Sequence, residues 1–320
     1  MRDKPIGIPR SAPLVTVVLA VGFVVCWSSG FVGAKLTASD TSVLTVLMWR
    51  FLIVAVILLP FLRSGGRGAI ARWSGAELVG QVVVGLLSQT GYTLTVYWAI
   101  ALGVSTGTTA LIDGIQPLVV ASLAAPLLGL MTSRRQWIGL GLGLLGVAVV
   151  TWADVASPGT EAPLWAYAVP LLGMLSLVGA TFVSRLDVIR TTARRALAVH
   201  CAASAVVYSV LAVATGNAVP PASGKFWLAV AWLVVLATLG AYGAYWALIE
   251  RVGITSTNAL LFLVPGVTTL WGAALYGEPL TALTIVGLAL ALAAAATVVV
   301  RRRSFARPHR APRASRGPCR

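Results

Sequence analysis

Charged residues are scarce in this sequence, and acidic residues are the scarcest of them. Asp, Glu, Lys and Arg together make up 10% of the 320 residues, and only nine residues are acidic, whereas 58% are apolar. A soluble domain carries about 25% charged residues. With a mean hydropathy of +0.90, the composition excludes an ordinary soluble domain and predicts a membrane protein that crosses the bilayer several times.

Cysteine and histidine are also rare, which argues against catalytic and metal sites. Cys26, Cys201 and Cys319 lie far apart without CxxC or metal-ligand spacing, so we expect no disulfide framework, no metal and no cofactor. The sequence has no HExxH motif, no paired acidic cluster and no GxxxxGK[ST] loop, and one of its two histidines, His309, lies in the C-terminal tail. We therefore expect neither a membrane-embedded enzyme nor a nucleotide-driven motor.

Basic residues, by contrast, are plentiful, with 24 Lys and Arg in all. Almost all of them lie in short hydrophilic breaks or in the tail "RRRSFARPHRAPRASRGPCR", where they can meet the anionic headgroups of the lipid bilayer. They form no folded basic face, so we do not expect nucleic acid as a partner.

Long apolar runs occupy most of the chain. Because backbone polar groups cannot stay unpaired in lipid, each run is expected to be a helix of about 20 residues. The run after "MRDKPIGIPR" is longer than the apolar part of a signal peptide and no convincing cleavage site follows it, so we take it as the first span. Breaks at charges, Gly and Pro give ten predicted spans, near 14–34, 43–62, 77–98, 105–130, 136–153, 164–184, 195–215, 226–247, 254–276 and 281–300.

The distribution of positive charge predicts the orientation of these spans. The breaks between successive spans must lie alternately on the two sides of the membrane. One side has only Lys35 and Lys225. The other side, which includes both termini, has all the other basic residues except Arg50, which falls inside a span. The positive-inside rule then places both termini in the cytoplasm. The sequence predicts a multi-pass protein of the cell membrane.

An internal repeat relates the two halves of the chain. The segment from Tyr97, "YWAIALGVSTGTTALIDGIQP", matches the segment from Tyr245, "YWALIERVGITSTNALLFLVP", and the constant offset also brings Pro117 onto Pro265, Gly129 onto Gly277 and Gly139 onto Gly287. Each half has five predicted spans, and five is odd, so the second copy enters the membrane with the opposite orientation. Inverted repeats of this kind are the architecture of secondary transporters.

Several stretches resemble the EamA-type branch of the drug/metabolite transporter superfamily: "CWSSGFVGAK", "WRF", the prolines of the fourth and ninth spans, and "LYGEPLTALTIVGLALAL". The resemblance covers nearly the whole chain. It implies an all-α integral membrane fold of ten transmembrane helices in two inverted five-helix repeats, with a central cavity and the fifth and tenth helices at the periphery. It also implies export or exchange of small metabolites without ATP. The first half has Leu130 where the second half has Glu278.

Four regions follow from these patterns. Residues 1–13 form a cytoplasmic N-terminal segment, 14–153 the first repeat, 164–300 the second repeat and 301–320 a basic cytoplasmic tail that we expect to be disordered.

A carboxylate inside a predicted span is the clearest candidate for function, because a buried charge in a membrane is costly and needs a partner, water or a functional path. Thr109, Asp113, Gln116 and Pro117 recur at three- and four-residue spacing and share one face. Asp113 either lines a translocation cavity, where it could bind a proton or a cationic substrate group, or forms a structural ion pair with Arg50. The two roles are compatible.

The other charged candidates favour structural or coupling roles. Arg50 must stay paired, and His200 is either a packed, hydrogen-bonded residue or a proton relay. Lys35 and Arg185 are expected to reach for the membrane interface. Glu278 is expected at the start of the tenth helix, where it suits the positive end of the helix dipole, although a gating role is an alternative.

Prolines, glycines and aromatic residues complete the candidates. Pro117 and Pro265 each free a backbone carbonyl in mid-helix, and the resulting kink either shapes the site and acts as a hinge or is static. Gly139 and Gly143 form a GxxxG motif, which serves packing within the chain or a homodimer. Further polar or aromatic walls of the cavity, or alternatively interhelical contacts, are Trp27, Gln81, Gln89, Tyr92, Tyr242, Tyr245 and Asn258.

Taken together, these features predict a secondary active carrier of a small molecule. We expect an exporter of an amino acid or another small organic metabolite, which alternates access and is driven by protons or by exchange. Efflux of amphipathic drugs is one alternative, since aromatic walls suit such solutes. A passive facilitator or channel is another.

Overall fold

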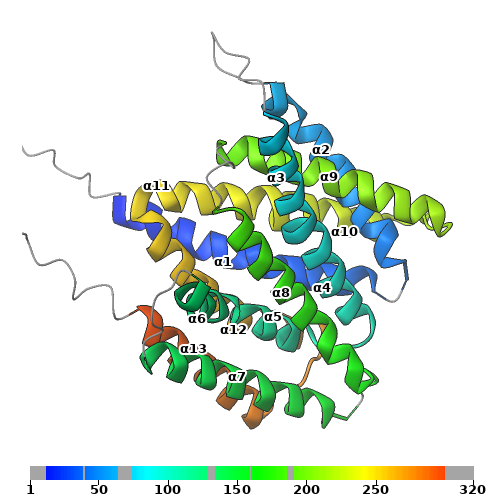
Figure 1. The fold of residues 1–320 in the computed structure, drawn as a ribbon. Coiled ribbons are helices and arrows are strands. Elements are labelled where there is room, and N and C mark those ends of the chain that lie inside the picture. Colours follow the sequence, from blue (N-terminus) through cyan, green and yellow to red (C-terminus); the bar gives the residue numbers. More distant parts are fainter. Residues whose placement is uncertain are drawn as a thin grey trace, which may run out of the picture.

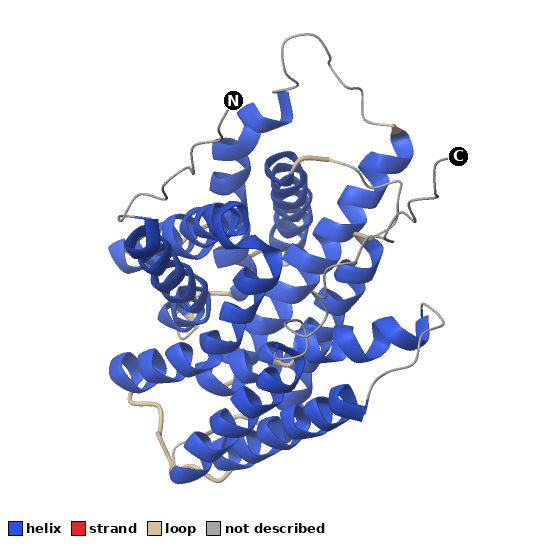
Figure 2. Cartoon of the chain, turned by 90° about the vertical axis from the view of Figure 1, so that its left-hand side faces the viewer, coloured by secondary structure: helices blue, strands red, loops and turns tan. Residues whose placement is uncertain are grey.

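Helices make up the regular structure of the computed structural model, which describes residues 12–38, 40–63, 74–127, 134–158, 160–185 and 191–299, and no strand occurs in these ranges (Figure 2). The predicted N-terminal segment up to residue 11, the basic tail with His309 and Cys319, and Leu130 lie outside them. The helices are α1 (Ala12–Thr37), α2 (Val43–Arg63), α3 (Gly75–Gly85), α4 (Tyr92–Ala101), α5 (Thr106–Gly114), α6 (Gln116–Leu127), α7 (Arg134–Val155), α8 (Ala168–Val183), α9 (Ala193–Ala214), α10 (Gly224–Trp232), α11 (Ala241–Leu260), α12 (Val264–Tyr276) and α13 (Ala282–Val299). Four short segments of other helix types join them: η1 (Leu86–Gly91), η2 (Leu164–Tyr167), η3 (Leu233–Gly240) and η4 (Leu261–Leu263).

The apolar helices fit a protein that crosses a membrane. Seven helical segments in the described ranges are long and apolar enough to span a bilayer. Their outward sides carry large apolar residues that would be unfavourable in water, such as Val56 at 69% exposure and Trp152 at 67%. The prediction of an all-helical membrane protein is confirmed, and the count of ten spans stays a prediction.

Four predicted spans are divided in the structure, and two of them, near 226–247 and 254–276, are divided by η3 and η4. The segment near 77–98 is divided by η1, a π-helix, and the segment near 105–130 is broken at Ile115, between α5 and α6. Gly253, whose φ is +81°, turns the chain within α11, so this element contains the end of one helix and the start of the next.

Both prolines that the sequence analysis expected to form kinks lie at such interruptions. Pro117 is the second residue of α6, directly after the break at Ile115, and Pro265 is the second residue of α12, directly after the 3₁₀ turn η4. Proline lacks a backbone N–H, which is tolerated in the first turn of a helix. The two breaks meet, because a Cβ atom at Gly114 would lie 2.8 Å from Cγ of Pro265.

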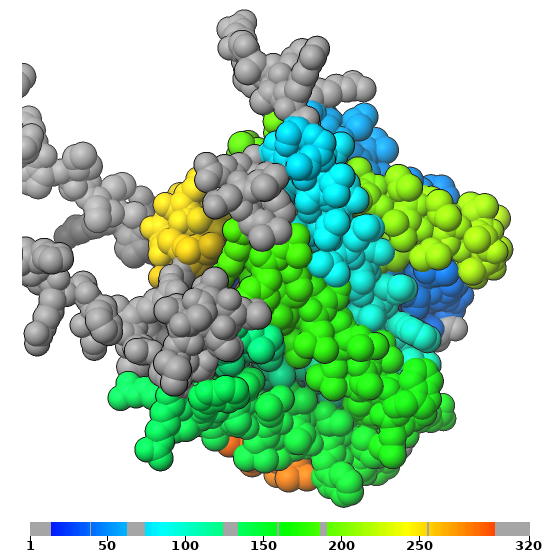
Figure 3. Space-filling view, in the orientation of Figure 1, coloured from blue at the N-terminus to red at the C-terminus, as the bar shows by residue number. Residues whose placement is uncertain are grey.

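The helices pack in long-range pairs: α2 with α9, α5 with α12, α7 with α13, α1 with α11 and α4 with α8. α7 and α13 lie together at the bottom of Figure 1, and α1 runs through the middle beside α11. On the face seen in Figure 3, α8 lies between α3 and α7.

Glycines bring α7 and α13 into close contact. A Cβ atom at Gly146 would lie 2.7 Å from the carbonyl oxygen of Gly287, and one at Gly139 would lie 3.3 Å from that of Ala294. Gly143 faces Leu118 and α13. The GxxxG face is therefore occupied within the chain, and a homodimer would need another surface.

Candidate substrate cavity and its closure

A cavity lies between α1, α2, α4, α8 and α11. The space open to the centre of a water molecule amounts to about 90 Å³, enough for several waters at 10–15 Å³ each. Its wall is mainly apolar and aromatic, with a few polar groups, as is usual for small-molecule sites. The lining residues are Trp27, Gly30, Phe31, Arg50, Ser88, Gln89, Tyr92, Thr93, Val96, Tyr97, Leu177, Ala237 and Tyr242.

Two π-helical segments supply part of this wall. A π-helix widens the helical turn and is frequent at functional sites. Gln89 of η1 donates a hydrogen bond from its amide to the hydroxyl of Tyr242, which lies two residues after η3. This bond connects η1 with the first turn of α11, directly after η3, beside the cavity.

Aromatic rings form one side of the cavity. Trp27 packs against Tyr242 with ring centroids 5.7 Å apart, against Phe23 at 5.4 Å and against Tyr245 at 6.3 Å. Tilted and edge-on contacts of this kind are favourable for aromatic pairs. The indole of Trp27 is thereby held at the cavity wall.

Arg50 is the one charged residue that lines the cavity in the described part of the chain. Its side chain is 5% exposed. Nη1 donates to the hydroxyl of Tyr97 at 2.6 Å, and Nε and Nη2 both donate to Oγ1 of Thr238, at 3.3 and 3.1 Å. The ion pair with Asp113 that we considered from the sequence is not formed.

Asp113 reaches the cavity only through Tyr92. The hydroxyl of Tyr92, which lines the cavity, donates to Oδ2 of Asp113 at 2.8 Å. Oδ1 of Asp113 is buried and has no hydrogen-bond partner among the described residues. A buried carboxylate oxygen without a donor is costly, so this atom is the natural place for a proton or for a donor from a ligand.

The remaining candidates form contacts away from the cavity lining. Gln116 donates to Thr181 at 3.1 Å, and Tyr245 donates to Asn258 at 2.9 Å. Nε2 of His200 is hydrogen bonded to Gln81 at 2.8 Å, where α9 passes so close to α3 that only glycine fits at position 85 of α3.

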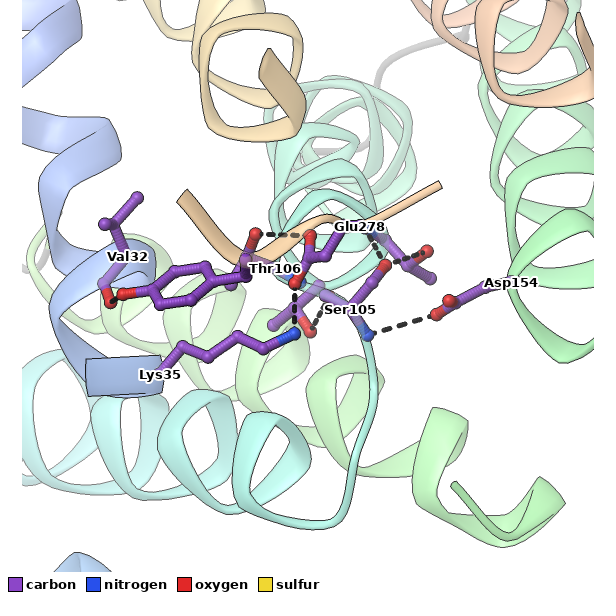
Figure 4. A network of polar contacts seen from close by, with 9 residues as sticks. Val32, Lys35, Ser105, Thr106, Asp154 and Glu278 are labelled. Atoms are coloured by element: carbon purple, nitrogen blue, oxygen red, sulfur yellow. Dashed lines mark hydrogen bonds and ion pairs between the residues drawn. The ribbon is translucent and has the colours of Figure 1, made fainter. Parts of the chain in front are cut away.

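A second polar cluster, drawn in Figure 4, joins ends of several helices. Nζ of Lys35, near the end of α1, lies 2.6 Å from Oε1 of Glu278. The Glu278 carboxylate also accepts from the backbone N–H of Thr106, at 3.0 and 3.2 Å, and from its hydroxyl at 2.7 Å. Both carboxylate oxygens are therefore satisfied.

These contacts add to the expectation for Lys35 and differ from that for Glu278. Lys35 forms an ion pair that the sequence did not indicate, and its expected place at the membrane interface stays a prediction. Glu278 precedes its own helix, α13, which begins at Ala282, and instead meets the first turn of α5. A carboxylate is favourable there because the first N–H groups of α5 have no carbonyl partner within the helix and the helix dipole is positive at this end.

A further carboxylate, which the sequence analysis missed, meets the same helix end. Oδ2 of Asp154, near the end of α7, accepts from the backbone N–H of Ser105 at 3.1 Å (Figure 4). Tyr276, which ends α12, donates to the carbonyl of Val32 at 2.7 Å. We call Lys35, Ser105, Thr106, Asp154 and Glu278 the α5 network, because it ties α1, α7 and the α12–α13 connection to the start of α5.

The α5 network lies next to one end of the cavity. Lys35 follows the cavity residue Phe31 by one helical turn, about 6 Å along α1 at 1.5 Å per residue. The ion pair thus holds together helix ends directly beyond the cavity.

Comparison with known proteins decides the family. The profile of the EamA-like transporter family matches the chain twice, over residues 14–152 and 164–300. The chain belongs to this family.

The relatives agree with the family. The proteins named "Uncharacterized inner membrane transporter YedA" from Escherichia coli strains K12 and O157:H7 are each 26% identical to the chain over 280 residues, which covers 86% of this chain and 87% of theirs. A protein of known crystal structure has a TM-score of 0.64 and 19% identity, covering 91% of this chain and 99% of its own, and supports the fold alone. The chain is a multi-pass membrane protein of the drug/metabolite transporter superfamily.

Proposed function

We propose that the protein is a secondary active carrier that moves a small organic metabolite by alternating access, and that its ten transmembrane helices form two inverted five-helix repeats. The single observation that carries this proposal is a mainly apolar and aromatic cavity inside the bundle, with an ion pair between distant parts of the chain one helical turn beyond it along α1. Such a pair can break and reform, which is what an alternating carrier needs at each end of its site.

The packing of the helices supports the repeat. A two-fold axis between the halves would exchange α2 with α9, α5 with α12 and α7 with α13, and each of these pairs is in contact. It would also exchange the pair α1/α11 with the pair α8/α4, and both pairs occur. The offset that brings Gly139 onto Gly287 brings Gly146 onto Ala294, and the two close approaches, Gly139 to Ala294 and Gly146 to Gly287, obey this exchange.

The direction of the closed end follows from the proposed orientation. With both termini in the cytoplasm, α1 ends at the outer face of the membrane, and so do α7 and α12. The α5 network then closes the outer end, and the structure corresponds to a carrier that is shut towards the outside.

Proton coupling is proposed through Asp113. Its Oδ1 has no partner among the described residues and its Oδ2 is bound to Tyr92 at the cavity wall. A proton on Oδ1 would remove the charge, and a change at this carboxylate reaches the cavity through the Tyr92 hydroxyl. We therefore propose export driven by the proton gradient or by exchange of solutes.

Efflux of amphipathic drugs is the second candidate. The observation that favours it is the set of aromatic residues in the cavity wall, which are Trp27, Phe31, Tyr92, Tyr97 and Tyr242. Flat apolar solutes would stack on such a surface.

The test has two steps with the full-length protein. An export screen first compares extracellular metabolites and drug tolerance of cells with and without expression, and this identifies the solute. Proteoliposomes then measure whether that solute accumulates against its gradient when a proton gradient or an excess of solute is imposed on the other side. Uphill accumulation is expected; purely downhill flux that does not saturate would show a pore.

A further inference from the structure

Among the described residues, no carboxylate contacts Arg50 to balance its charge. In the part of the chain that the structure describes, its guanidinium bonds to the neutral hydroxyls of Tyr97 and Thr238 alone, although the residue is only 5% exposed. A buried charge without a counter-ion is strongly unfavourable. No acidic residue lines the cavity in the described ranges, so the cavity itself has a net positive wall.

The guanidinium also keeps free donors. Arginine has five N–H groups, and three of them are used, one each on Nε, Nη1 and Nη2. One N–H therefore remains on each of the two terminal nitrogens. Donors on the two terminal nitrogens form a fork that can bind a carboxylate or phosphate in bidentate geometry when both point to the same side.

The surrounding residues fix this fork in place. The Thr238 hydroxyl donates to the carbonyl of Leu233 at 3.0 Å within the π-helix η3, so its oxygen is turned towards Arg50. Tyr97 accepts from Nη1 and also packs its ring 5.7 Å from the guanidinium carbon. The arginine is thus held rigidly beside the cavity before any ligand arrives, which lowers the cost of binding.

We propose that Arg50 binds the anionic group of the solute, and that the cavity takes a small organic anion whose apolar or aromatic body lies against Trp27 and Tyr242. The claim that the bound anion is transported rests on the proposed carrier function. The claim that the anion binds at Arg50 does not, and it can be tested by itself. The anion supplies a counter-charge that none of the described residues in contact with Arg50 supplies, and the aromatic wall supplies apolar contact.

Three probes of one shape separate the effect of charge from that of the ring: benzoate, benzamide and benzylamine. Each is titrated by calorimetry into the purified full-length protein in detergent at pH 7, where benzoate is an anion, benzamide is neutral and benzylamine is a cation. We expect benzoate to bind about tenfold or more tightly than benzamide, which corresponds to about 1.4 kcal/mol, and benzylamine to bind most weakly.

Variants then assign the preference to the arginine. Arg50→Gln should bind benzoate and benzamide equally, whereas Arg50→Lys, which keeps the charge but loses the fork, should retain part of the preference. Lys225→Gln is the matched control, because Lys225 is an exposed cation paired with Asp40 outside the cavity, and it should behave like the unaltered protein. Thermal unfolding in detergent checks that each variant is folded.

The proposal is overturned if the unaltered protein binds no benzoate, if it prefers benzylamine, or if folded Arg50→Gln keeps the preference for benzoate. These results do not depend on transport. A protein that binds benzoate through Arg50 but never accumulates a solute uphill would contradict the carrier function and leave this inference standing.

Discussion

Lys35 and Glu278 are separated by 243 positions in the chain, yet their side chains form an ion pair of 2.6 Å between Nζ and Oε1. The carboxylate is 8% exposed and the lysine 29%. Because Glu278 also binds the first residue of α5, the pair connects the end of α1 to the start of a helix that carries Asp113. The ion pair beyond the cavity and the candidate proton site, Asp113, are therefore linked through α5.

Removing this pair should impair transport. Lys35→Met leaves the partly buried carboxylate without its counter-ion, and Glu278→Gln leaves the lysine without one. We expect each variant to lower the rate of solute export about tenfold or more, which corresponds to about 1.4 kcal/mol. Glu278→Ala should cost more, because it also removes the bonds to Thr106.

The double variant distinguishes a pair from two independent residues. If Lys35 and Glu278 act together, Lys35→Met with Glu278→Gln should lose less than the sum of the two single losses, expressed as free energies. Strictly additive losses, or normal export in both single variants, would contradict a closing role.

Asp113 should control the pH dependence of transport. Asp113→Asn cannot change charge, so we expect transport in proteoliposomes to be abolished or to lose its response to pH, while insertion into the membrane stays normal. Tyr92→Phe removes the hydroxyl that binds Oδ2 and should alter the same pH response without abolishing it. Glu161→Gln, an exposed carboxyl, is the control. Unaltered proton-coupled flux in Asp113→Asn would rule out the proposed proton site.

The contact between α7 and α13 should tolerate no side chain at its closest point. Gly146→Ala places a methyl group against the backbone of Gly287, whereas Gly141→Ala on the same helix meets nothing within 4 Å. Overpacking of this kind costs about 1–3 kcal/mol. In detergent, the midpoint temperature of unfolding should be lower for Gly146→Ala than for the unaltered protein, and unchanged for Gly141→Ala. Equal midpoints for the two variants would mean that the helices do not pack this closely.

The orientation of the chain can be measured with a thiol reagent that does not cross membranes. In a background with the native cysteines replaced by Ala, Val219→Cys lies at a strongly exposed position after α9, and Ser64→Cys lies in the break after α2. With both termini in the cytoplasm, intact cells should label position 219 and not position 64. The reverse labelling pattern would mean that the α5 network lies at the cytoplasmic face instead of the outer face.

Features that depend on one helix alone, such as its bounds, could be predicted from the sequence. The predicted spans 43–62 and 136–153 agree within a few residues with α2 and α7, because their apolar length and bounding charges are set by the bilayer. The cavity wall was partly predicted: Trp27, Gln89, Tyr92 and Tyr242 line it. Tyr97 was noticed only as a landmark of the repeat.

Contacts between residues that are distant in the chain could not be predicted from the sequence. The partner of Lys35 is 243 positions away, so no local pattern in the sequence indicates the pair. Asp154 was overlooked because it lies at the end of a predicted span, where a carboxylate is normally solvated; its role depends on the position of Ser105 in space. For Arg50 and Asp113, proximity along a helix hairpin suggested a pair, but the side chains bind Thr238 and Tyr92 instead.

The central claim, that the pair Lys35–Glu278 keeps one end of the carrier shut, can be tested by pulsed electron spin resonance on the full-length protein in lipid. Spin labels are placed at Thr41, in the turn after α1, and at Leu280, which is 46% exposed before α13, in the background without native cysteines. The account predicts one short distance population, and a second, longer population when Lys35→Met is added. An unchanged distance distribution in Lys35→Met would contradict it.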